Sequence, residues 1–102
     1  MNLERRSDKR VILNLPVKWG GLSGRHTARI EDLSMGGCFV NTHGVVTVGE
    51  VITLEIGLPS GKWLTLRGSV TSVQEAIGFG LEFPFLTDEE ARTLQQIITS
   101  RT

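Results

Sequence analysis

Two arginines near the start of the chain have side chains and a spacing that suit ligand binding. Arg6 and Arg10 lie four positions apart, just before the first apolar segment. A planar guanidinium group can bind a phosphate through two parallel hydrogen bonds, or the O6 and N7 acceptors on the edge of guanine. Two such groups suit a ligand that carries both. About one in four chains of this length contains such a pair by chance, so the alternative is a solvated basic tail.

A second candidate is the segment 32–37, which reads Asp-Leu-Ser-Met-Gly-Gly. The Asp32 carboxylate can accept hydrogen bonds from N1 and N2 of guanine, and the Ser34 hydroxyl can donate or accept. Gly36 and Gly37 follow, and Gly37 permits a backbone conformation and a close approach that a Cβ atom would block. The alternative is an ordinary turn, because Asp, Ser and Gly are the residues that β-turns select.

The charge is unevenly distributed along the chain, although its sum is zero. Residues 1–30 hold seven Lys and Arg against two acidic residues, and residues 31–102 hold four against nine, so the two parts carry about +5 and −5. An anionic ligand should therefore approach the N-terminal part. The zero net charge argues against a protein that binds DNA or RNA through summed basic charge.

The apolar residues alternate with polar ones in six short segments, which is typical of half-buried strands. The predicted strands are residues 11–19, 25–31, 38–40, 51–56, 62–73 and 78–83. Pro16 favours an edge or a bulge in the first of them. Six strands with regular turns indicate an all-β fold, a six-stranded antiparallel barrel whose closure removes exposed sheet edges.

A helix is predicted after the last strand. Thr87 and Glu90 form a capping-box pattern, and the acidic residues 88–90 complement the helix dipole. One apolar stripe consists of Ala91, Leu94, Ile97 and Ile98. This stripe can pack across a barrel opening or serve a partner, and we expect core packing.

The composition excludes several classes of function. One cysteine and two isolated histidines, His26 and His43, do not suggest a metal site, and no nucleophile elbow or phosphate-binding glycine loop is present, so we expect no enzyme and no cofactor. Cys38 is expected to be a buried thiol. The polar N-terminus and the lack of a long apolar run predict a cytoplasmic protein without membrane insertion.

The two candidate motifs together resemble the PilZ domain, the bacterial receptor module for the second messenger cyclic di-GMP. The pattern of that family is RxxxR in an N-terminal loop, followed about twenty residues later by [DN]xSxxG. Arg6 and Arg10 match the first part, and Asp32, Ser34 and Gly37 match the second. Residues 78–83 are similar to the late strand of the family, and the helix from residue 87 is similar to its C-terminal helix. The resemblance implies a six-stranded barrel with an arginine loop that closes over the ligand.

This resemblance gives a domain division and a site. Residues 1–10 are expected to form a flexible arginine loop, and residues 11–102 a PilZ-like barrel with its C-terminal helix. The loop should order when cyclic di-GMP binds and so signal to an unidentified downstream protein effector. The expected ligand-binding residues are Arg5, Arg6, Arg10, Asp32, Ser34, Gly36 and Gly37. In proteins that this chain resembles, an arginine at the position of Arg5 often accompanies two mutually intercalated ligands.

Three other functions stay open from the sequence. A PilZ-type adaptor could bind proteins with nucleotide binding optional, although such a domain needs no RxxxR pattern. An oligonucleotide-binding barrel would need aromatic stacking platforms and a basic strand face. The chain has no Tyr, four Phe and two Trp, so that face is hard to assemble. A small hydrolase lacks a candidate catalytic set.

Overall fold

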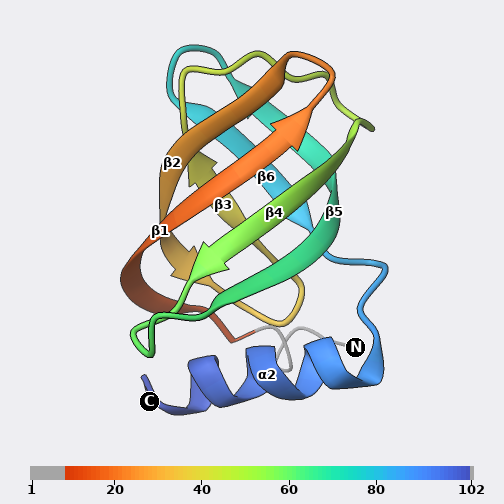
Figure 1. The fold of residues 1–102 in the computed structure, drawn as a ribbon. Coiled ribbons are helices and arrows are strands. Elements are labelled where there is room, and N and C mark those ends of the chain that lie inside the picture. Colours follow the sequence, from red (N-terminus) through yellow and green to blue (C-terminus); the bar gives the residue numbers. More distant parts are fainter. Residues whose placement is uncertain (1–8, 102) are drawn as a thin grey trace.

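A computed structural model describes residues 9–101 of the chain. Six strands are followed by one helix (Figure 1). The elements are β1 (Val11–Gly21), β2 (Gly24–Leu33), β3 (Gly37–Asn41), β4 (Val51–Gly57), β5 (Trp63–Gln74), β6 (Gly78–Glu82) and α2 (Asp88–Thr99). All six strands and the helix lie where the sequence predicts them, with ends that differ by a few residues. Lys62 and Phe83, for example, fall just outside β5 and β6.

The strands form a closed antiparallel barrel in the order β1-β2-β3-β6-β5-β4. This confirms the predicted fold class. Strand β3 pairs with β6, its neighbour in space, and the chain then crosses one end of the barrel through residues 42–50 before β4 begins (Figure 1). Strand β4 pairs with β1 on one side and with β5 on the other, which closes the barrel.

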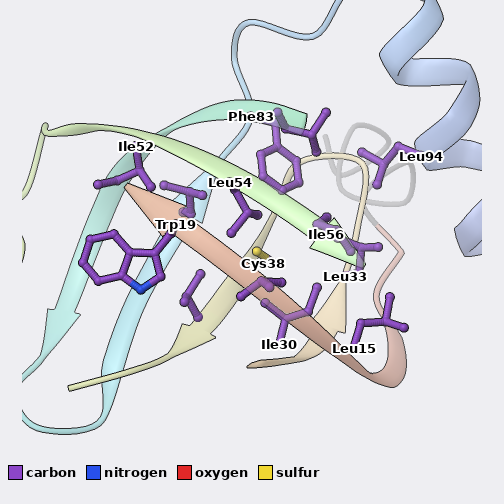
Figure 2. Packing of buried hydrophobic residues seen from close by; sticks show 14 of the residues in the cluster. Leu15, Trp19, Ile30, Leu33, Cys38, Ile52, Leu54, Ile56, Phe83 and Leu94 are labelled. Carbon is purple, nitrogen blue, oxygen red and sulfur yellow. The ribbon is translucent and has the colours of Figure 1, made fainter. Parts of the chain in front are cut away.

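The alternation of apolar residues in β1 places one set of side chains inside the barrel. Val11, Leu13, Leu15, Val17 and Trp19 are buried, and the residues between them are exposed. The indole of Trp19 packs edge-to-face against Phe79, with 5.1 Å between the ring centroids. Figure 2 shows how buried side chains of several strands meet in a single core. The barrel is therefore filled with side chains, and any binding site must lie on the outside or at an end.

Two irregularities interrupt the strand pairing. In β1 the register against β2 shifts between Ile12 and Leu15, directly before Pro16, which agrees with the bulge predicted near that proline. In β5 the register against β6 shifts between Val70 and Ser72. A bulge adds one residue to one strand and turns side chains to a new face of the sheet.

Helix α2 lies across the end of the barrel at which β1 begins (Figure 1). The predicted capping box is present, since Thr87 Oγ1 accepts from Glu90 N at 3.1 Å and Glu90 Oε1 accepts from Thr87 N at 3.0 Å. Leu94 and Ile98 are buried in the core, and Ile97 is half-buried against it. The apolar stripe thus packs on the barrel, as predicted. Within residues 9–101 no helix has the length and apolarity needed to cross a membrane.

Candidate functional site

The pairing of β1 with β2 brings the two sequence motifs together. Val11 pairs with Leu33 and Ile12 pairs with Asp32, so the start of β1 lies beside the end of β2. Arg10 directly precedes β1, and its Nη1 atom donates to Asp32 Oδ2 at 2.5 Å. The hairpin therefore joins two motifs that are separated by 22 positions in the chain.

Asp32 uses both of its carboxylate oxygens. Oδ2 binds Arg10, and Oδ1 accepts a hydrogen bond from the backbone N–H of Phe39 on β3 at 3.0 Å. The Arg10 side chain is 53% exposed and the Asp32 side chain 25%, so water and ligands can reach the ion pair. An exposed pair of this kind contributes only about 0.2 to 1 kcal/mol to stability. A ligand that offers comparable partners can therefore separate the two groups at little cost.

Ser34 holds the turn that follows β2. Its side chain is buried, and its hydroxyl donates to the carbonyl oxygen of Gly37 at 3.2 Å. The same oxygen accepts from the backbone N–H groups of Gly36 and Gly37, at 3.1 and 3.2 Å. A hydroxyl has one donor and two acceptor positions, so these three bonds use all of them. A ligand contact through Ser34 Oγ would have to replace one of these bonds.

The two glycines fasten the turn to β6. The carbonyl of Gly36 accepts from Phe83 N at 2.9 Å, and a Cβ atom on Gly37 would lie 2.1 Å from the carbonyl oxygen of Leu81. The close approach predicted for Gly37 is therefore present, but it is made to the backbone of β6. The other part of that prediction, a backbone conformation that a Cβ atom would block, is wrong. Gly37 is not among the described glycines with positive φ, which are Gly24, Gly49 and Gly61.

These residues surround one cavity of about 490 Å³ on the barrel. It is lined by Arg10, Asp32, Ser34, Gly36, Gly37, Cys38, Phe39, Thr71, Ser72, Gly80, Leu81 and Glu82. Five of the seven residues predicted to bind a ligand thus lie together. The other two, Arg5 and Arg6, lie outside the described residues, as does most of the predicted flexible loop.

The comparison with protein families matches this chain to the PilZ domain over residues 4–100. This chain belongs to the PilZ domain family. The match confirms the resemblance stated from the RxxxR and DxSxxG patterns. No curated protein matches the chain.

Solved structures with the same fold accompany this family match. The inhibitor of motility MotI/DgrA of Bacillus subtilis superposes with a TM-score of 0.82 at 20% identity, over 95% of this chain and 51% of that one. The PilZ domain of YcgR from Escherichia coli, solved with c-di-GMP, superposes at 0.76 and 18% identity, over 95% and 91%. The PilZ domain of CeSA from a cellulose-synthesizing bacterium gives 0.71 and 19%, over 90% and 96%. This chain spans about half the length of the MotI/DgrA chain.

Several residues that line the cavity of this PilZ domain were not predicted from the sequence. Phe39, Thr71, Ser72, Gly80 and Glu82 line it together with the motif residues. They come from β3, β5 and β6, which lie side by side only because β3 pairs with β6. No local sequence pattern predicts that pairing. The alternation within a strand predicts which side chains face outward, but only the strand order shows which outward side chains lie together.

Cys38 also lines the cavity of the PilZ domain, but it is not a reactive group. Its side chain is 3% exposed, as predicted for a buried thiol. Burial raises the pKa of Cys38, and the charge of Asp32 raises it further, while Arg10 acts in the opposite direction. The thiol therefore stays protonated and is a poor nucleophile. Among residues 9–101, no three His, Cys, Asp or Glu side chains are grouped as a metal site would require.

A second cavity, of about 620 Å³, lies between β2 and the segment that follows β3. Its lining includes His26, Asn41, His43 and Ile77. His26 stacks on Trp19 with ring centroids 4.2 Å apart, and its Nε2 lies 3.0 Å from Ser23 Oγ. His26 thus has an ordinary packing role in the strand, as predicted. None of the motif residues that the structure describes lines this cavity.

Proposed function

We propose that this PilZ domain is a non-enzymatic receptor for cyclic di-GMP. The observation that carries the proposal is the cavity in which Arg10 and Asp32 meet. A cation and a carboxylate stand there within reach of one ligand, beside a turn built by Ser34 and Gly37. The structurally similar PilZ domain of YcgR was solved with c-di-GMP, which supports the same class of ligand.

The chemistry of the two charged groups suits the two parts of this ligand. The guanidinium groups of Arg6 and Arg10 would bind phosphate oxygens and the O6 and N7 edge of guanine. The Asp32 carboxylate would accept from N1 and N2 of guanine. A bidentate contact to guanine discriminates against other bases by about 1 to 3 kcal/mol. An exposed ion pair contributes only roughly 0.2 to 1 kcal/mol to stability, so the Arg10–Asp32 bond would be a small obstacle to these ligand contacts.

Signal output would follow from the position of Arg10. It is the last residue before β1, so a ligand that binds its guanidinium also fixes the path of the residues that precede it. Ordering of residues 1–10 over the ligand would create a new surface beside the barrel. A downstream protein effector could recognise this surface only when the ligand is bound.

Calorimetric titration with cyclic di-GMP tests the proposal. We expect the wild type to bind, and Arg6→Ala and Arg10→Ala each to weaken binding by about tenfold to a hundredfold, because each loses a bidentate contact. Circular dichroism should show an unchanged fold, since both residues precede Val11, where β1 begins. Arg92→Ala on the exposed face of α2 is the matched control and should bind as the wild type does.

Two outcomes would count against the receptor. Equal affinity of the wild type and both arginine variants would place the ligand elsewhere. Binding of a protein effector with no detectable nucleotide binding would favour the adaptor function. A single-stranded DNA oligonucleotide, titrated in parallel, should show no binding, and tight binding would favour the oligonucleotide-binding barrel instead.

A further inference from the structure

The bulge in β5 presents two neighbouring hydroxyl groups on the same side of the barrel. Val70 pairs with Leu81 and Ser72 pairs with Gly80, so Thr71 is the inserted residue. In a regular strand, neighbouring side chains point to opposite faces. Here Thr71 and Ser72 are both exposed and both line the cavity that contains Arg10 and Asp32. Bulges often redirect side chains in this way next to binding sites.

Both hydroxyls lie over Gly80 of β6. A Cβ atom built on Gly80 would be 2.7 Å from Ser72 Oγ and 3.1 Å from Thr71 Oγ1. The lack of a side chain at Gly80 therefore leaves room for both hydroxyls to lie over β6. Among the described residues, neither hydroxyl has a hydrogen-bond partner within the protein. Both groups are free to bind a molecule in the cavity.

The ion pair and the two hydroxyls of the cavity come from different strands of the barrel. Arg10 and Asp32 lie at β1 and β2, whereas Thr71 and Ser72 lie on β5, beyond β3 and β6 in the strand order. Glu82 on β6 lies between these two sides, opposite Gly37 of β3 and Ser69 of β5. A phosphate only accepts hydrogen bonds and would be repelled by this carboxylate. The phosphates of a ligand should therefore lie toward Arg10, and a base should lie toward β5.

We infer that Thr71, Ser72 and Glu82 form a wall that recognises a guanine base and rejects adenine; this inference rests on the proposed function. Guanine presents the N1–H and N2 amino groups as donors, which a carboxylate and hydroxyl oxygens can accept. Adenine presents N1 as an acceptor at the corresponding position, and a carboxylate has no proton to donate to it. With adenine bound over it, the Glu82 carboxylate would be covered without a hydrogen-bond partner, which is how a site rejects a close analogue.

The test compares cyclic di-GMP with cyclic di-AMP by calorimetry. We expect the wild type to prefer cyclic di-GMP. Thr71→Val and Ser72→Ala should each weaken its binding by about threefold to tenfold, the loss of one neutral hydrogen bond. Glu82→Gln should narrow the preference for guanine over adenine, because an amide can donate to adenine N1. Thr65→Val, an exposed threonine of the same strand outside the cavity, is the matched control and should change neither affinity.

The outcomes separate this wall from the receptor function itself. If the wild type binds and Arg10→Ala loses affinity, but the Thr71, Ser72 and Glu82 variants keep wild-type affinity and preference, the wall is overturned and the receptor stands. If the wild type binds no cyclic di-GMP, both are overturned. All three residues are exposed strand residues, so the variants should fold, and circular dichroism verifies this.

Discussion

At the residue scale, the turn of the second motif stabilises the barrel through its own hydrogen bonds and packing. Ser34 has all its hydrogen-bonding positions filled by the turn, and Gly37 lies against the backbone of β6. Asp32 is different, because its carboxylate is partly exposed and faces the cavity. Within this motif the aspartate is therefore the side chain best placed for ligand contact, and the serine and glycine shape the surface around it.

Gly37→Ala should destabilise the fold. The new methyl would meet the carbonyl oxygen of Leu81 at 2.1 Å, and strand backbone cannot move aside without breaking the β3–β6 ladder. We expect a loss of roughly 1 to 3 kcal/mol in the free energy of unfolding, as for other overpacked sites. Chemical denaturation measures it. Gly20→Ala, whose methyl would lie 3.8 Å from the nearest side-chain atom, is the control. Equal stability of both variants would contradict the close packing of β3 on β6.

At the element scale, periodicity predicts the strands but not their partners. The alternation from Val11 to Trp19 and the capping box at Thr87 depend on neighbouring residues only, so β1 and α2 were predicted correctly. The β3–β6 pairing depends on contacts between residues about forty positions apart, for which the sequence has no local signal. For the same reason the motif side of the cavity was predicted, and the side formed by Thr71 and Ser72 was missed.

The first hairpin should also report ligand binding through the segment that precedes it. Lys9 and Arg10 are exposed at the entrance to β1. We expect trypsin to cut after Arg5, Arg6, Lys9 or Arg10 rapidly in the free protein and several-fold more slowly with cyclic di-GMP, since ordering removes access to the protease. Mass spectrometry of the fragments measures both rates. Cleavage after Arg92 in α2 is the internal control, and equal N-terminal rates with and without ligand would rule out the ordering of residues 1–10.

At the scale of the whole molecule, the barrel is a filled scaffold with its proposed site on the outer surface. The core is continuous from Trp19 at one end to Leu94 of α2 at the other (Figure 2). Ligand binding therefore need not rearrange the interior. The chain carries its excess of basic residues before residue 31 and its excess of acidic residues after it, so we expect an anionic ligand to approach the N-terminal part.

We expect the number of ligands bound to depend on Arg5. Two stacked cyclic di-GMP molecules would bring twice the phosphate charge to the site, and a third guanidinium could offset it and lie flat against an exposed guanine. We expect calorimetry to give about two ligands per chain for the wild type and a ratio nearer one for Arg5→Ala. A wild-type ratio near one would show that Arg5 has no such role, without affecting the site at Arg10 and Asp32.

The most direct test of the proposed site is a titration with cyclic di-GMP followed by two-dimensional amide NMR. We expect the largest shifts at the amides of Asp32, Gly37, Phe39 and Gly80, which line the cavity beside Arg10. The amide of Gly44, at the second cavity, should stay in place. Shifts concentrated around Gly44, or no shifts at saturating ligand, would contradict the assignment of this cavity as the cyclic di-GMP site.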